Sequence, residues 1–260
     1  MINLDKLSIT SVELIHGYNN AGVCELMLDE LTDTSIANTE EKVDIVGKGG
    51  RKINSLKKNK AVTVTGTNGV ISGGLLATQT GGTLTAAEGE VTKVRVAETL
   101  TVTDNKATTG AKAVGTVGNE LKSLNVKVSD SLGKAYTQAA TASAGKFAYA
   151  PATKEITFFE GDIEDGAEII VFYDKEVTGR TVSNPSDKYS KKLKVYLDCL
   201  ATDSCDNIYH VQYIFPRADF SGNFDTAMGD NPAVHAFEFE SLAGSCGGAG
   251  NLWDMIVFGE

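Results

Sequence analysis

Helical periodicity is nearly absent from this chain, and short strand-like segments separated by Gly, Asn, Asp and Thr take its place. Phe237 and Phe239 alternate with Glu238 and Glu240, which puts the aromatic and acidic side chains on opposite faces of a strand. Four segments in the last third are the best strand candidates: Lys191–Leu197, Tyr209–Phe215, Val234–Glu240 and Leu252–Phe258. The pattern predicts a mainly β protein.

The first third has the same character. Its strand candidates are Gly22–Leu28, Thr39–Val46 and Lys60–Gly66. In the last of these, β-branched residues alternate with small or polar ones, which favours a sheet with one buried face. The segment Ser72–Ala77 fits either a short helix or a tight packing segment, and the residues do not decide between them.

The composition changes at about Thr83, and from there to about Glu176 the chain is rich in Ala, Thr, Gly and Val. Six strands are expected in this part: Val91–Val96, Leu100–Thr103, Leu124–Ser129, Lys146–Tyr149, Glu155–Phe159 and Glu168–Tyr173. The acidic, Gly-containing connection between the last two indicates a hairpin. We therefore expect a discontinuous β-sandwich or barrel host domain, 1–83 with 177–260, and a small inserted immunoglobulin-like β-sandwich at 84–176.

Charge narrows the range of functions. The 260 residues hold 24 Lys or Arg and 34 Asp or Glu, a net charge of −10, which argues against a general nucleic-acid-binding surface. One basic cluster runs against this trend: Lys48, Arg51, Lys52, Lys57, Lys58 and Lys60. It overlaps the motif GKGG at Gly47–Gly50, and this motif lacks the residue order and the helix start of a phosphate-binding P-loop. A solvated loop and a contact with the acidic surface of a neighbouring subunit both remain open.

The sequence gives no sign of a membrane or of export, because it lacks a long apolar run and a signal-peptide pattern. Four scattered cysteines, Cys24, Cys199, Cys205 and Cys246, predict reduced, packed thiols of a cytoplasmic protein. A late disulfide between Cys199 and Cys205 stays open.

No local motif predicts catalysis, a metal or a cofactor. The histidines, His16, His210 and His235, are isolated, and surface or half-buried positions are expected for them. Two acidic loops carry calcium-type oxygen donors without calcium-loop spacing: Asp219, Asn223, Asp225, Asp230 and Asn231 in one, and Glu160–Gly166 in the other. Asx-turn chemistry explains these loops better. We expect Trp253 to be a core anchor rather than a sugar platform.

Four segments resemble the major tail tube proteins of long-tailed bacteriophages, and together they cover about half of the chain. They begin with AGVCELMLDE, IIVFYDKEVTG, DKYSKKLKVYLDC and HAFEFESLAG, at Ala21, Ile169, Asp187 and His235. The resemblance lies in the residues of these segments and in their order along the chain. The middle of the chain has no such match.

The resemblance implies a structural virion protein, not an enzyme. Such subunits form hexameric rings that stack around a tape-measure protein, meet tail-terminator and baseplate proteins, and let DNA pass through the lumen without specific binding. The implied location is the virion tail, assembled in the cytoplasm of the host bacterium. We expect the basic loop to reach acids of an adjacent ring, such as Asp29, Glu30, Glu40 or Glu41, and the insert to lie outside. A capsid or decoration protein, a glycan-binding module and a β-rich hydrolase are the alternatives.

Overall fold

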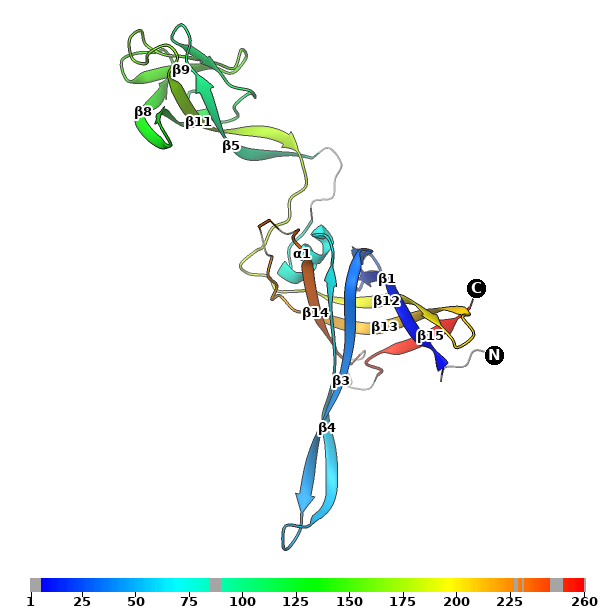
Figure 1. Cartoon of the computed structure of the whole chain (residues 1–260). Coiled ribbons are helices and arrows are strands. Elements are labelled where there is room, and N and C mark those ends of the chain that lie inside the picture. The colour runs from blue at the N-terminus through cyan, green and yellow to red at the C-terminus, as the bar shows by residue number, and fades with distance from the viewer. Residues whose placement is uncertain (1–5, 85–89, 227–228, 231, 244–249, 260) are drawn as a thin grey trace. The chain divides into compact units, whose positions relative to one another are not determined.

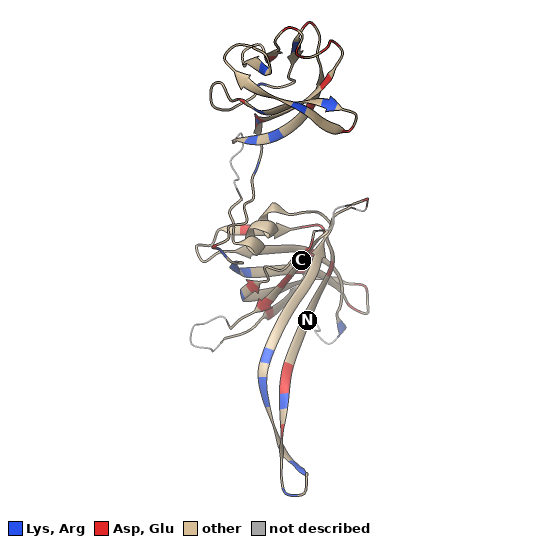
Figure 2. Cartoon of the chain, turned by 90° about the vertical axis from the view of Figure 1, so that its left-hand side faces the viewer, with Lys and Arg blue, Asp and Glu red and all other residues tan. Residues whose placement is uncertain are grey.

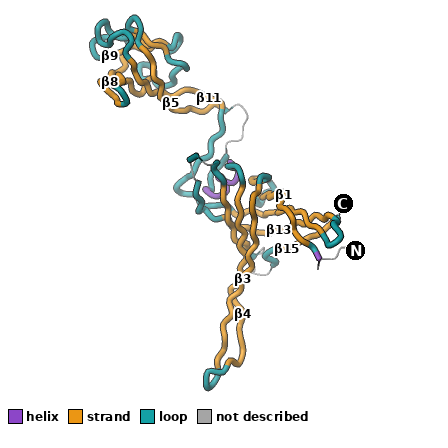
Figure 3. The backbone as a smooth tube through the Cα atoms, viewed as in Figure 1, coloured by secondary structure: helices purple, strands orange, loops and turns teal. Residues whose placement is uncertain are grey.

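The computed structural model describes residues 6–84, 90–226, 229–230, 232–243 and 250–259. Strands dominate the backbone (Figure 3), so the predicted mainly β fold is confirmed. The chain divides into two compact units, one of Met1–Leu84 with Val182–Glu260 and the other of Thr85–Thr181. We call them the host unit and the insert. Leu84 and Val182 form an antiparallel bridge, so the chain leaves and re-enters the host unit at neighbouring points.

The host unit is one curved antiparallel sheet that forms a half-barrel (Figure 1). Its elements are β1 (Ser8–Tyr18), β2 (Cys24–Leu28), β3 (Leu31–Val46), β4 (Lys52–Asn68), α1 (Gly73–Thr80), β12 (Lys192–Thr202), β13 (Ile208–Phe220), β14 (His235–Ser241) and β15 (Asp254–Phe258). The strand order is β2-β1-β12-β13-β14-β4-β3, and β15 pairs with the first half of β13.

Alternation along the strands builds the core of the host unit. Every second residue of β12 is buried, from Leu193 to Ala201, while the residues between them are more exposed. On β14, Phe237 and Phe239 are buried and Glu238 and Glu240 are exposed, as the sequence predicts. One face of the sheet therefore packs on the core, and the other is free for a different role.

The helix α1 settles the open question about Ser72–Ala77. The Ser72 hydroxyl caps the helix by accepting a hydrogen bond from the Leu75 amide, at 3.3 Å. Gly81 ends it at φ 68°, in the left-handed region that Gly adopts without strain. Leu75 is buried in the core of the host unit. In the part of the chain that the structure describes, no helix is long and apolar enough to cross a membrane.

The insert has its own sheet and its own core. Its strands are β5 (Val91–Thr101), β6 (Lys106–Thr108), β7 (Leu121–Val128), β8 (Ser131–Ala139), β9 (Lys146–Ala150), β10 (Glu155–Thr157) and β11 (Glu168–Thr178). They follow the order β5-β11-β7-β8-β9-β10-β6, and β8 and β9 pair in parallel. The buried cluster around Phe147, Ile156 and Tyr173 contains no residue of the host unit.

Three expectations about strands and core were wrong. β10 pairs with β6 and β9, and β11 pairs with β5 and β7, so the two do not form the predicted hairpin. The two segments expected at Val91–Val96 and Leu100–Thr103 form the single strand β5, whereas β6 and β8 were not foreseen. Trp253 is 37% exposed and packs edge-on against Tyr213, so it lies at the surface of the core.

Candidate functional site

The distal parts of β3 and β4 form a two-stranded ribbon that leaves the sheet (Figure 1). β14 pairs with β4 only from Val62 to Asn68, so beyond that point β3 and β4 pair with each other alone. We call residues 39–60 the arm. The predicted strands at Thr39–Val46 and Lys60–Gly66 are parts of these two longer strands.

The GKGG motif is the turn at the tip of the arm. The Gly47 amide donates to the Arg51 carbonyl at 2.8 Å, and the Gly50 amide donates to the Gly47 carbonyl at 3.1 Å. Gly49 and Gly50 have φ angles of 80° and 76°, which a side chain rarely tolerates. The glycines thus serve a hairpin turn, in agreement with the view that this motif is not a P-loop.

All six predicted cations lie on the arm, and three of them have partners there (Figure 2). Lys52 pairs with Asp44 at 2.6 Å, Lys57 with Glu40 at 2.7 Å, and Lys58 with Glu41 at 3.3 Å. Both partners of each pair are exposed, so each pair contributes little to stability. The hydrogen bond from Lys57 lowers the pKa of Glu40.

The other three cations, Lys48, Arg51 and Lys60, form no ion pair within the described ranges. Two of the acids expected to serve a neighbouring ring, Glu40 and Glu41, are held by lysines of their own arm. Sequence reasoning missed these internal pairs because it took the basic segment as a loop, whereas strand pairing brings the lysines opposite acids.

A second surface lies on the side of the sheet that faces away from the core, over β14, β4 and β3. Three cross-strand rows cover it: Ala236–Thr67–Asp33, Glu238–Thr65–Ser35 and Glu240–Thr63–Ala37. Residues paired directly across strands share a face, so these nine side chains lie together. Three are acidic, the others are small, and none is Lys or Arg. We call this surface the acidic face.

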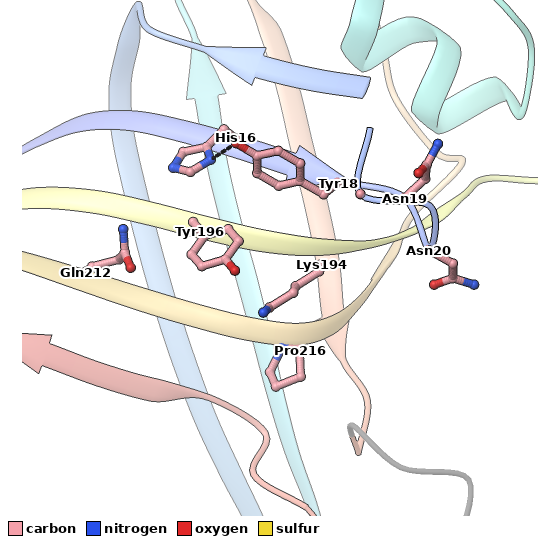
Figure 4. A pocket seen from close by; sticks show the side chains of 9 residues that line it. His16, Tyr18, Asn19, Asn20, Lys194, Tyr196, Gln212 and Pro216 are labelled. Atoms are coloured by element: carbon pink, nitrogen blue, oxygen red, sulfur yellow. Dashed lines mark hydrogen bonds between the residues drawn. The ribbon is translucent and has the colours of Figure 1, made fainter. Parts of the chain in front are cut away.

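A hollow of about 510 Å³ lies over β1, β12 and β13 (Figure 4). The His16 ring stacks on Tyr196 at 5.1 Å between centroids, and its nitrogens lie 3.1 Å from the Tyr18 hydroxyl and 3.1 Å from Asp198. Lys194 lies 5.0 Å from the Tyr196 centroid. These groups satisfy one another, and the residues that line the hollow include no Ser, Thr or Cys nucleophile.

The other two histidines lie apart from this hollow. His235 is buried and joins β14 to α1, because its ring accepts from the Ser72 amide at 3.3 Å and contacts the Gln79 side-chain oxygen at 2.8 Å. Burial lowers the pKa of His235, which fits this neutral, structural role. His210, on β13, stacks on Phe258. No group of three or more potential metal ligands occurs among the residues placed by the structure.

Some carboxylate oxygens of the two acidic segments already bond to other groups of the protein. Asp219 lies on β13 and pairs with Lys192 at 3.1 Å, and Asp162 accepts a hydrogen bond from the Gly145 amide at 2.7 Å. Asn231 lies outside the described residues. This internal bonding agrees with a structural origin for both loops.

The described cysteines are free thiols: Cys24 and Cys205 are exposed, and Cys199 is buried. Burial raises the pKa of the Cys199 thiol to about 12, so this group stays protonated at neutral pH. Cys246 lies outside the described residues.

The host unit is a half-barrel with a projecting ribbon, and the insert is a second β unit, so the chain is of the mainly β class. The chain belongs to the YomU/Tube protein family, whose model matches residues 8–255. This match confirms the resemblance to phage tail tube proteins, and it gives the chain a structural role in the virion tail. No curated protein matches the chain.

Proposed function

We propose that this chain assembles with copies of itself into stacked hexameric rings, and that the rings form the tail tube through which phage DNA is delivered. The observation that carries the proposal is the acidic face. A channel for DNA has to let a polyanion slide without holding it, and like charge on its wall meets that need.

The acidic face has the chemistry of such a wall. Glu238 and Glu240 lie two residues apart on β14, so both carboxylates lie on the same face. Their cross-strand partners Thr65 and Thr63 add hydroxyl groups and no positive charge. We infer that the acidic face lines the lumen.

The arm supplies the contact between rings in this proposal. Its unpaired cations Lys48, Arg51 and Lys60 approach acids of a subunit in the adjacent ring. The paired cations Lys52, Lys57 and Lys58 are instead engaged by acids of their own arm.

The host unit and the insert correspond in this proposal to a tail-tube domain, 1–83 with 177–260, and an immunoglobulin-like domain, 84–176, on the outer surface. The further partners are the tape-measure protein inside the tube and the terminator and baseplate proteins at its ends. Assembly takes place in the cytoplasm of the host bacterium, and the activity is mechanical rather than enzymatic.

Negative-stain electron microscopy of the purified chain, over a range of protein and salt concentrations, tests the proposal. We expect hollow tubes or stacked rings with sixfold symmetry. Binding of the protein to capsids, or to a glycan array without rings, would instead support a decoration or glycan-binding role.

The lumen assignment needs its own variant. Tubes of the double variant Glu238→Lys, Glu240→Lys should retain short duplex DNA, whereas wild-type tubes should not. The matched control places the same charge change on an exposed loop of the insert, with Glu160→Lys and Asp165→Lys. Equal DNA retention by both variants would show that the acidic face does not line the channel.

A further inference from the structure

The arm exposes apolar side chains in addition to its charged ones. Val43 and Ile45 lie two residues apart on β3, and Leu56 is the cross-strand partner of Val43, so the three share one face of the ribbon. They are 37%, 40% and 55% exposed. We call them the apolar ladder. Val46 and Ile53 add exposed apolar surface near the tip.

A two-stranded ribbon with no third strand and no covering layer is marginally stable in water. An exposed run of apolar side chains on such a ribbon is also a site for unwanted association. The ladder therefore indicates a contact that the described residues of this chain do not supply to one another.

The charge of the arm indicates which partner surface makes this contact. The arm has seven Lys or Arg and three Asp or Glu, a net charge of +4, whereas the whole chain carries −10, so the rest carries −14. The cations that remain unpaired at the tip, Lys48 and Arg51, are thus complementary to the remainder of the same chain. A second copy of this chain offers that surface at the highest local concentration in an assembling tube.

We propose that the apolar ladder is the main holding contact of the arm on a second copy of this chain, and that Lys48 and Arg51 mainly guide the approach. This inference rests on the proposed function, and it changes the chemistry assigned to the arm. Exposed ion pairs contribute little and are screened by salt, while burial of apolar side chains is stronger and is not screened. Charges at the edge of an interface act chiefly on the rate of association.

The test compares two double variants of the full chain in a sedimentation assay of assembly, at low and high salt. Val43→Thr with Leu56→Thr keeps strand-compatible side chains and removes apolar surface. Lys48→Gln with Arg51→Gln removes the tip charges. The matched control is Val128→Thr, which changes an exposed valine on β7 of the insert.

We expect the ladder variant to raise the critical concentration for assembly by roughly tenfold for each side chain, at both salt concentrations. The charge variant should slow assembly at low salt and leave the critical concentration within about threefold of wild type. The control should behave as wild type. Trp253 fluorescence should report the same unfolding midpoint for all monomers, because the substituted side chains are exposed.

Two outcomes overturn the inference while leaving the proposed function in place. One is a ladder variant that assembles at the same critical concentration as the wild type. The other is a wild-type chain that stops assembling at high salt, together with a charge variant that already fails to assemble at low salt. If the wild-type chain itself fails to associate under every condition, the proposed function fails and the inference fails with it.

Discussion

Phe239→Ala should destabilise the host unit strongly and leave the insert folded. The Phe239 ring is fully buried, and its centroid lies 5.2 Å from that of Phe215 and 5.1 Å from that of Phe220. Removing a buried Phe costs about 3–5 kcal/mol, because lost transfer free energy and a residual cavity add together. The loss of two close ring pairs places this site in the upper half of that range.

Urea unfolding followed by fluorescence measures this effect, since the single tryptophan, Trp253, belongs to the host unit. With a urea dependence of about 2 kcal/mol per molar, a loss of about 4 kcal/mol lowers the midpoint by about 2 M. Hydrogen exchange of insert peptides should stay unchanged, because the insert core shares no residue with the host core.

The matched control is Phe147→Ala, which removes a ring from the core of the insert. It should weaken the protection of insert amides and leave the Trp253 midpoint where it is. The reasoning is refuted if Phe147→Ala shifts the Trp253 transition as far as Phe239→Ala does, since the two units would then unfold as one.

Three further outcomes follow from the structure. Gly66→Ala should lower the unfolding free energy of the host unit by about 1–3 kcal/mol through overpacking, because a Cβ there would lie 2.6 Å from the Phe237 ring; an unchanged urea midpoint would refute this. The hydrogen bond from Lys191 lowers the pKa of Glu25 in the folded state. The pair therefore stabilises the host unit at pH values above the unfolded pKa of about 4.5, and this stabilisation is lost as the pH falls through the folded pKa. Glu25→Gln should therefore lower stability at pH 7 and flatten its fall between about pH 5 and 3, as urea titrations would measure. Replacing 85–181 by a short Gly-Ser linker should leave tube formation intact in electron micrographs, and folded monomers that no longer polymerise would contradict an outer, dispensable insert.

Strands that bury one face could be read from the sequence, because burial imposes a period of two. Val234–Glu240 shows this, since its aromatic and acidic residues alternate along β14. Strand partners could not be read in the same way. The connection after β10 has the composition of a hairpin turn, yet β10 pairs with β6, about 50 residues earlier in the chain, and with β9. Local turn chemistry carries no information about such distant pairing.

The sequence singled out the basic cluster as a candidate contact, and its role stays a prediction, whereas its form as a two-stranded ribbon was missed. The basic segment from Lys48 to Lys60 was expected to be a loop, because its apolar residues Ile53 and Leu56 do not follow the period of two of a half-buried strand. The internal pairs of Lys57 and Lys58 depend on the register of β3 against β4, which only the structure supplies. The acidic face also requires β14, from the last third of the chain, to pair with β4, from the first third.

The surfaces that sequence patterns failed to explain are the ones that a single copy leaves unsatisfied. Core residues such as Phe239 are determined by contacts within one chain, so their pattern can be interpreted from one chain. Leu56 of the arm is an apolar side chain exposed to water, and Glu238 and Glu240 gather negative charge on one face. Exposed apolar surface of this kind marks sites of interaction. In a member of a tube protein family, the exposed features that the single chain does not use are therefore the best guide to the contacts between subunits and to the surface that we propose faces DNA.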